Sequence, residues 1–255
     1  MKFYILTSKK IAIMGFCVIA LALTVIISIQ GITVATNASA QNKKIPIYCV
    51  DREEKVVSIS FDAAWGNEQT GELLDILDKY NIKTTFFLVG QWVDKYPDSV
   101  KDISNRGHDV SNHSNTHPHM TKLSNEKMVE EIESCNKKIQ DLTGKKPILF
   151  RPPYGDYNNA VVDAVNSTNM YCIQWDVDSL DWKDPSPDDM VKRIKSKMKP
   201  GSIILLHNGA KNTPAALPKI IETITAEGYQ IVPISQIIHQ GSYTTDNEGK
   251  QHKCT

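Results

Sequence analysis

The chain has 255 residues, of which 41% are hydrophobic and 23% charged, a composition typical of folded globular proteins rather than disordered chains. Its 29 Lys and Arg residues balance 29 Asp and Glu residues, so the formal net charge is +0. Because no basic stripe or acidic tail stands out, charge gives no support to a nucleic-acid partner.

The N-terminal segment differs from the rest of the chain. Three lysines accompany an uncharged apolar run, residues 11–29, that nearly spans the ~30 Å hydrocarbon core of a membrane. This pattern predicts a signal peptide or membrane anchor over residues 1–36, with its N-terminus inside and the following domain outside the cytoplasm. Ala-Ser-Ala, ending at Ala40, resembles a signal-peptidase site, so cleavage after Ala40 and a retained anchor both stay open.

A polar stretch, residues 37–54, predicts a spacer. Residues 55–240 then alternate between short β-branched or aromatic runs and longer amphipathic runs, which indicate strands and helices in turn. We expect strands over residues 55–61, 83–90, 108–112, 147–150, 171–177, 201–207 and 229–234. We expect helices over residues 68–80, 91–106 with an interruption at Pro97, 124–144, 157–167, 186–198 and 214–228. The polar tail, residues 241–255, is expected to be frayed.

About seven strands that alternate with helices predict an α/β fold built on a parallel sheet, closed into a barrel or open. Only one glycine follows the first strand within residues 62–68, which disfavours a nucleotide-binding loop. The five cysteines show no CxxC and no paired spacing, so we expect buried or free thiols rather than a disulfide framework or zinc knuckle.

Ionisable side chains follow five of the expected strands, at the point where each strand ends. They are Asp62, the histidines His113, His117 and His119, Arg151, the group Asp176, Asp178, Asp181 with Trp182, and His207. Because the carboxyl ends of parallel strands meet at one rim, where α/β barrels assemble their active sites, the pattern predicts a catalytic rim.

The histidines have alternative interpretations. His113 and His117 are four residues apart, so both imidazoles can face one metal ion at about 2.0–2.1 Å. Such a pair also occurs by chance, and the neighbouring rim residues are what favour a metal site here. His119 fits a surface loop as well as a ligand. His207 fits a satisfied buried histidine, but its place at a strand end favours a general acid.

The remaining rim residues also have two interpretations each. Arg151 fits an ordinary salt bridge or, in a rigid Arg-Pro-Pro turn, a bidentate contact with a carboxylate. Asp181 fits a turn or helix-cap acid, or a carboxylate that orients a catalytic histidine. The aromatic residues fit core packing, or flat surfaces that stack on sugar rings; they are Trp65, Trp175, Trp182, Tyr154 and Tyr157, and Trp65, Trp182 and Tyr154 are the expected substrate contacts.

Five motifs occur in a fixed order: Asp62, then HSNTH at 113–117, RPPYG at 151–155, DSLDW at 178–182 and LLH at 205–207. In this order they resemble the polysaccharide deacetylase family, carbohydrate esterases that remove acetyl groups from chitin, peptidoglycan and xylan. The resemblance covers residues 56–238. The membrane-proximal layout and the sequence SFDAAWG also resemble sporulation-type deacetylases.

The resemblance implies a distorted (β/α) barrel and a set of roles for the rim residues. A divalent metal ion, zinc in first place, is bound by His113 and His117. Asp62 is the base that activates water, and Arg151 pairs with it. His207 is the general acid, Asp181 tunes it, and the backbone N–H at Tyr154 helps to hold the oxyanion.

One position departs from the family pattern. The family's second acid, a metal ligand, falls at position 63, where this chain has Ala63. Asp62 could turn to bind the ion and give up its role as base, or water, Asn112 or Glu68 could fill the gap. The site could also hold metal weakly or not at all.

The expected function is that of an exported, membrane-anchored or secreted hydrolase that removes N-acetyl groups from a cell-wall glycan. The rival is a non-catalytic glycan-binding protein that kept the barrel and lost the metal site, and Ala63 is the feature that favours it. The sequence leaves the sugar, the ion and the oligomeric state open.

Overall fold

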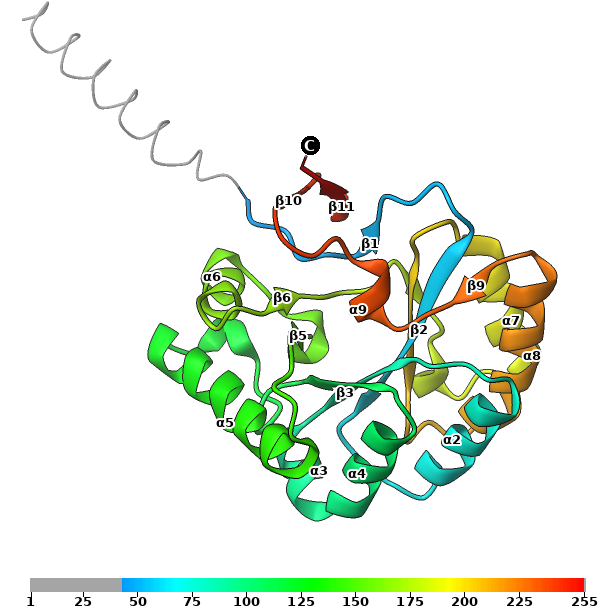
Figure 1. Cartoon of the computed structure of the whole chain (residues 1–255), viewed down its shortest axis with the longest axis horizontal. Helices are drawn as coiled ribbons and strands as arrows, with labels where there is room; N and C mark the ends of the chain where they lie inside the picture. The colour runs from blue at the N-terminus through cyan, green and yellow to red at the C-terminus, as the bar shows by residue number, and fades with distance from the viewer. Residues whose placement is uncertain (1–42, 255) are drawn as a thin grey trace, which may run out of the picture. The chain divides into compact units, whose positions relative to one another are not determined.

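A parallel β-sheet runs through the part of the chain that the computed structural model describes, residues 43–254 (Figure 1). Seven strands are hydrogen-bonded in the order β6-β5-β4-β3-β2-β8-β7, and β9 (Gln230–Ile231) pairs with the beginning of β2. Every pair in this sheet is parallel. The predicted α/β fold with about seven parallel strands is confirmed. In chain order the seven are β2 (Val56–Ala63), β3 (Thr85–Leu88), β4 (Asp109–Asn112), β5 (Leu149–Phe150), β6 (Tyr171–Cys172), β7 (Val177–Asp178) and β8 (Ile203–His207).

The sheet curves into an incomplete barrel. β6 and β7, at the two ends of the strand order, are joined by residues 173–176, a connection that spans at most about 17 Å. The two ends therefore lie near each other, although no ladder between β6 and β7 closes the sheet within residues 43–254. The single strand expected over residues 171–177 is wrong, because β6 pairs with β5 while β7 pairs with β8.

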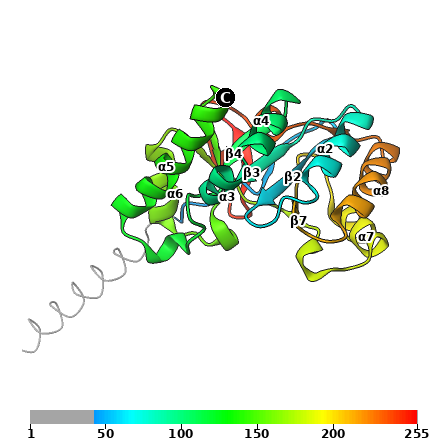
Figure 2. The ribbon, with the colours of Figure 1, turned by 90° about the horizontal axis from the view of Figure 1, so that it is seen from below.

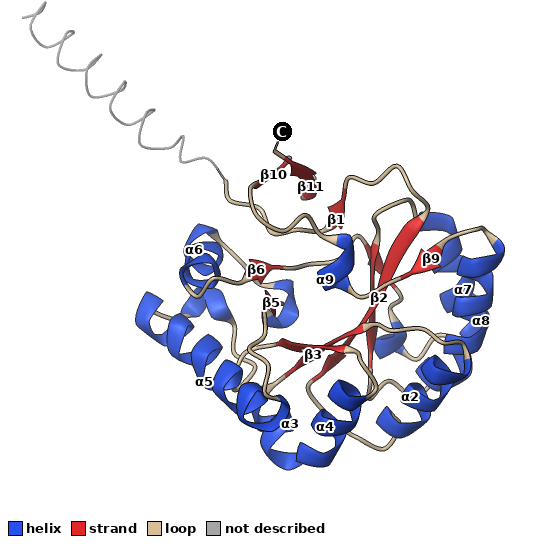
Figure 3. Ribbon diagram, in the orientation of Figure 1, coloured by secondary structure: helices blue, strands red, loops and turns tan. Residues whose placement is uncertain are grey.

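The longer helices cover the outer side of the strands, while α9 packs against the apolar cluster of the interior (Figures 1, 2 and 3). Ser124 caps α5 by accepting a hydrogen bond from the Lys127 N–H, and Gly144 ends it with a φ of 73°. The interruption expected at Pro97 within residues 91–106 is confirmed, because Pro97 has no N–H to continue the first helix and begins the second. In chain order the helices are α2 (Thr70–Lys79), α3 (Gly90–Lys95), α4 (Pro97–Asn105), α5 (Asn125–Thr143), α6 (Asn159–Ser167), α7 (Pro187–Lys197), α8 (Thr213–Ala226) and α9 (Ile234–Ile237).

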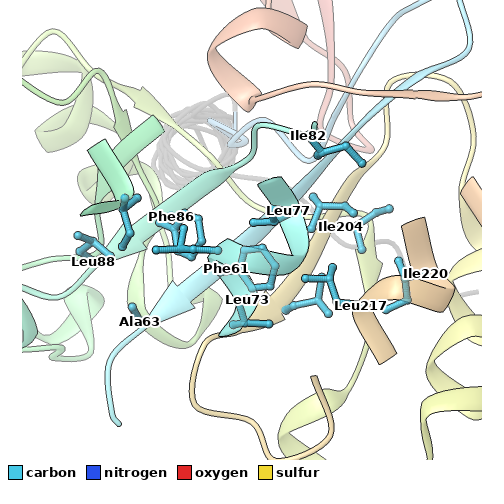
Figure 4. Close-up of a cluster of buried hydrophobic side chains, with 14 of the residues drawn as sticks. Phe61, Ala63, Leu73, Leu77, Ile82, Phe86, Leu88, Ile204, Leu217 and Ile220 are labelled. Atoms are coloured by element: carbon cyan, nitrogen blue, oxygen red, sulfur yellow. The ribbon is translucent and has the colours of Figure 1, made fainter. Parts of the chain in front are cut away.

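Strand β2 separates an outer apolar layer from the barrel interior, where its polar side chains lie beside a second apolar cluster that includes Phe87, Leu149 and Ile203. Phe61 stacks on Phe86 of β3 with ring centroids 4.9 Å apart. Because strand side chains alternate between faces, Ser60 and Asp62 point to the opposite side, toward the barrel interior. Figure 4 shows the apolar layer, in which alternate β2 residues pack against α2 and α8 through Phe61, Ala63, Leu73, Leu77, Leu217 and Ile220.

The expectation of a frayed C-terminal tail is wrong. Residues of the tail form β10 (Tyr243–Thr245) and β11 (Lys250–Lys253), which join β1 (Cys49–Val50) in a three-stranded sheet of order β1-β11-β10. Gln251 is fully buried, and its side-chain amide bonds the backbone N–H and carbonyl of His239. A polar composition was therefore compatible with an ordered tail, because its polar groups are hydrogen-bonded to the domain and to part of the predicted spacer.

The cysteine prediction is confirmed for the described residues, where Cys49, Cys135 and Cys172 are buried free thiols and Cys254 is an exposed one. The signal or anchor segment expected over residues 1–36 lies outside the described residues. Within residues 43–254, no helix has the length and apolar character needed to cross a membrane.

Candidate active site

A cavity of about 460 Å³ opens where the strands of the sheet end. Most of the predicted site residues line it, while Arg151 lies directly behind it in contact with Asp62, and Asp181 lies behind it in contact with His207. The structure thus brings together residues from five separate strand ends, while their chemical roles stay predictions. The lining residues are Asp62, Trp65, His113, His117, Tyr154, Trp175, Asp178, Trp182, Leu205 and His207.

Asp62 and Arg151 form a buried ion pair. Arg151 Nη1 donates to Asp62 Oδ1 at 2.7 Å, and Arg151 is completely buried. The contact is not the bidentate fork that the sequence suggested, because Nη2 turns to the Ser60 hydroxyl at 2.9 Å and the Gln174 carbonyl at 3.2 Å. The guanidinium also lies 4.0 Å from the ring centroid of Phe87, which fixes its plane.

This pairing decides the charge on Asp62. Burial alone would raise the pKa of the carboxyl group, but the Arg151 guanidinium and His113 beside it more than offset that effect, so the pKa lies below its ordinary value. Asp62 is therefore a carboxylate at neutral pH, with a side chain that is 6% exposed. An ionised carboxylate at the wall of a cavity can accept a proton.

His113 is held in one tautomer by the backbone. Its Nδ1 lies 2.7 Å from the Arg151 carbonyl oxygen, which can only accept, so Nδ1 carries the proton. Burial lowers the pKa of His113, against the opposing effect of Asp62, and the neutral ring leaves a lone pair on Nε2. That atom lies 3.5 Å from Asp62 Oδ2, at the wall of the cavity.

His117 lies next to His113, with ring centroids 4.9 Å apart. Its backbone is left-handed, with a φ of 60°, and its N–H donates to the Ser114 hydroxyl at 3.0 Å. Burial, then the neighbouring His113, lowers the pKa of His117 to about 4. Two neutral imidazoles side by side are in the protonation state that metal binding requires.

A third protein ligand is what a metal ion would lack. The Asn112 side chain bonds Ile132, Asn136 and the Ser114 N–H, so its oxygen is already occupied. The Glu68 carboxylate accepts from the neighbouring Asn67 N–H. Tyr154 contacts the rings of both His117 and His119, at 4.5 and 4.3 Å between centroids. The structure therefore gives no support to Asn112, Glu68 or His119 as a metal ligand.

The residues present do not fit a metal centre with three protein ligands. Within residues 43–254, no group of three His, Cys, Asp or Glu side chains is arranged to hold an ion. Ala63, at the position where the family has an acid, is completely buried among apolar side chains. The chain presents two neutral imidazoles and one carboxylate that is already paired with Arg151.

His207 and Asp181 form a second coupled pair. His207 Nδ1 lies 2.7 Å from Asp181 Oδ1, and the His207 backbone N–H donates to Asp181 Oδ2 at 2.7 Å. The Thr213 hydroxyl donates to the same Oδ2 at 2.8 Å, so the completely buried carboxylate is well satisfied. Burial would lower the pKa of His207, but the hydrogen bond and charge of Asp181 reverse this, so the pKa is raised. The imidazolium is thereby stabilised as a proton donor.

Exposed aromatic side chains surround the cavity. Trp65, Tyr154 and Trp182 are 47%, 62% and 51% exposed, although large apolar surfaces are usually buried. Tyr154 has a left-handed backbone with a φ of 60°, a conformation that is costly for a bulky residue and is often found at functional sites. Half-exposed aromatic faces at the wall of a cleft suit contact with sugar rings.

Asp178, expected at the rim, and Trp175, one of the aromatic residues considered for sugar stacking, both line the cavity. Leu205 is the lining residue that the sequence reasoning missed. Leu205 lies two residues before His207 in β8, so the alternation of strand side chains could have placed it on the same face. Thr213, at the start of α8, gave no sequence signal for its bond to Asp181.

Comparison with known proteins identifies the family. The family model for polysaccharide deacetylase matches residues 50–173. A peptidoglycan-N-acetylglucosamine deacetylase of Bacillus cereus is 33% identical over 194 residues, which cover 74% of this chain and 91% of that protein. The chain belongs to the polysaccharide deacetylase family.

Other relatives of this polysaccharide deacetylase family member are more varied. The uncharacterized protein YlxY of Bacillus subtilis is 34% identical over 195 residues, covering 76% of this chain and 61% of YlxY. Among solved structures, a pseudoenzyme of carbohydrate esterase family 4 from Bacillus anthracis is 36% identical with a TM-score of 0.73, covering 75% of this chain and 68% of that one. A mutant of that pseudoenzyme with restored enzymatic activity matches at 37% identity. The family thus contains deacetylases and a member that lacks activity.

Proposed function

We propose that the chain is a hydrolase that removes N-acetyl groups from a cell-wall glycan of the peptidoglycan or chitin type. The observation that carries this proposal is the presence of two ion pairs at one cavity. In one, Arg151 holds the Asp62 carboxylate, and in the other, Asp181 holds the His207 imidazole. A buried ion pair adds little net stability compared with apolar packing, so two such pairs at one cavity are better explained by chemistry.

The proton transfers follow from the charges. Asp62, ionised, takes a proton from a water molecule as the water oxygen forms a bond to the acetyl carbon. His207, protonated, gives its proton to the amide nitrogen as the carbon–nitrogen bond breaks, leaving acetate and a free amine. The Tyr154 backbone N–H is proposed as a donor to the oxyanion, a contact of the kind that contributes a few kcal/mol. Trp65 and Trp182 are proposed to contact the sugar rings.

The divalent ion belongs to this proposal as an expectation from the family. His113 and His117 are its proposed ligands, zinc is the proposed ion, and two imidazoles without a third protein ligand make binding weak. Export of the domain, anchoring by residues 1–36 and a place among sporulation-type deacetylases are likewise proposals, supported by the apolar run and the sequence SFDAAWG.

The test is acetate release from N-acetylated peptidoglycan fragments and chitooligosaccharides, with zinc or other divalent ions added. We expect release by the wild type, and at least a hundredfold less from His207→Gln, because general acid catalysis contributes about 10²–10⁴-fold. His252→Gln, in the tail, is the matched control and should keep full activity. Equal release by the wild type and His207→Gln would overturn the assignment.

A second function is favoured by one specific observation, the missing third ligand at Ala63. In this alternative the chain binds cell-wall glycan at the aromatic rim without hydrolysing it. It predicts glycan binding that does not change when a chelator is added, with much less than one metal ion per chain by elemental analysis. Metal near one ion per chain, together with acetate release, would exclude this alternative.

A further inference from the structure

Trp65 lies flat against His207. The two ring centroids are 5.3 Å apart and the ring planes differ by 27°. Both side chains line the cavity, and 47% of Trp65 is exposed while the His207 side chain is only 12% exposed. The indole therefore covers a face of the imidazole that would otherwise meet solvent.

The backbone around both residues keeps this stack in place. Gly209 follows His207 by two residues, and a Cβ atom there would come within 2.8 Å of Trp65 Nε1 and 2.7 Å of the Trp65 carbonyl oxygen. Trp92 Nε1 donates to the Gly66 carbonyl, and the Asn208 N–H donates to the Asp62 carbonyl at 3.2 Å. The loop after β2 and the turn after β8 are thus tied together, and only a glycine leaves room for the indole.

We infer that Trp65 is a positioning residue for His207, holding the plane of the imidazole so that Nε2 faces the cavity and stabilising the protonated ring by stacking. This rests on the proposed function in taking His207 as the proton donor. Asp181 fixes only one edge of the ring, at Nδ1, and a ring held at one edge can still tilt about its Cβ–Cγ bond. A flat partner on the face removes that freedom.

The charges around His207 agree with this inference. The electron-rich face of an indole attracts a cation, and the attraction grows as the cation is buried; the His207 side chain is only 12% exposed. Stacking therefore acts in the same direction as the carboxylates that raise the pKa of His207. The titratable groups that interact electrostatically with His207 come from η3 (Asp181–Lys183), β2, β7 and the segment at the end of β4: Asp181, Asp62, Asp178, His113 and His117.

Trp182 provides a matched control. It lines the same cavity and is 51% exposed, but its ring centroid lies 4.7 Å from the Lys183 ammonium nitrogen. A tryptophan that only contacts substrate should affect substrate binding alone. A positioning tryptophan should also change His207 in the free protein.

The experiment is an NMR titration of His207 in the free wild type and in the variants Trp65→Leu, Trp65→Phe and Trp182→Leu. We expect Trp65→Leu to lower the proton affinity of His207 about two- to tenfold, Trp65→Phe to restore most of it, and Trp182→Leu to leave it unchanged. An unchanged proton affinity in Trp65→Leu would overturn the inference, as would an equal loss in Trp182→Leu. Because Trp65 is half exposed, we expect its variants to fold. If Trp65→Leu does not fold, Trp65→Phe still tests the effect of replacing the indole by a smaller flat ring.

Kinetics give an independent check. With acetate release as the assay, Trp65→Leu should lower kcat with little change in KM, while Trp182→Leu should mainly raise KM. The reverse pattern would count against a positioning role. The titration needs no turnover, so a chain that releases no acetate overturns the proposed hydrolase and still leaves the effect of Trp65 on His207 measurable.

Discussion

The Asp181→Asn substitution tests the coupled pair behind the cavity most directly. Asp181 accepts three hydrogen bonds, from His207 Nδ1, the His207 N–H and the Thr213 hydroxyl. An asparagine can accept at one side only, and its NH₂ group must face a donor at the other. A hydrogen bond to a charged group contributes about 1.5–3 kcal/mol and a neutral one about 0.5–1.5 kcal/mol. Loss of the charge should therefore destabilise the protonated form of His207, relative to the neutral form, by about 1–2 kcal/mol. This corresponds to a roughly five- to thirtyfold fall in the proton affinity of His207.

The assay is an NMR titration of His207 combined with thermal unfolding at several pH values. The pKa of His207 is raised in the folded protein, so this group contributes stability that is fully present below its unfolded value, about 6.5. That contribution is lost as the pH rises through the folded pKa. The difference in Tm between the wild type and Asp181→Asn should thus be larger at pH 6 than at pH 9.

Asp184→Asn, at an exposed position three residues along, is the control and should titrate like the wild type. The reasoning is refuted if Asp181→Asn leaves the proton affinity of His207 unchanged. A Tm difference that grows toward alkaline pH would also contradict it, because the sign of the linkage would be reversed.

Three further outcomes follow from the structure. Arg151→Met leaves its carboxylate partner buried and unpaired, so we expect a loss of about 3–5 kcal/mol in urea unfolding, and a loss below 1 kcal/mol would contradict the ion pair. Ala63→Asp should increase zinc bound per chain in elemental analysis while lowering stability by about 1–3 kcal/mol, since position 63 is in the apolar cluster; unchanged metal content would refute it. The pKa of His252 is raised by Asp246 and then Asp51, so the tail should become more sensitive to proteolysis as the pH rises through that pKa, relative to His252→Gln at each pH. Equal sensitivity of both proteins at every pH would show that His252 does not hold the tail.

Strand positions and the rim could be predicted from the sequence because both depend on local patterns. Residues 55–61 alternate and are β-branched, and an ionisable residue follows directly, so Asp62 was expected at the rim where the structure has it. The split of residues 171–177 could not be seen, because an apolar run carries no information about which neighbour each part pairs with. Likewise the order of the tail depends on the pairing of β11 with Cys49 and Val50 of β1, which lie far from it in sequence.

The details of the site depend on side-chain direction, which a motif does not contain. Arg151 was expected to form two parallel hydrogen bonds to one carboxylate. Only Nη1 donates to Asp62, because Nη2 donates to the Ser60 hydroxyl instead. The lack of an acid at position 63 was visible in the sequence. Whether Asn112 could replace it was not, because its use in a hydrogen-bond network behind the strand appears only in the fold.

Arg151 serves the site through two different parts of itself. Its guanidinium holds Asp62, while its backbone carbonyl holds the Nδ1 proton of His113. Asp62 and His113 are therefore both held by Arg151. Their distance from each other depends on this one residue rather than on the open side of the barrel. A change of side chain at this position can release Asp62 alone, whereas a displacement of the strand end would carry both groups together.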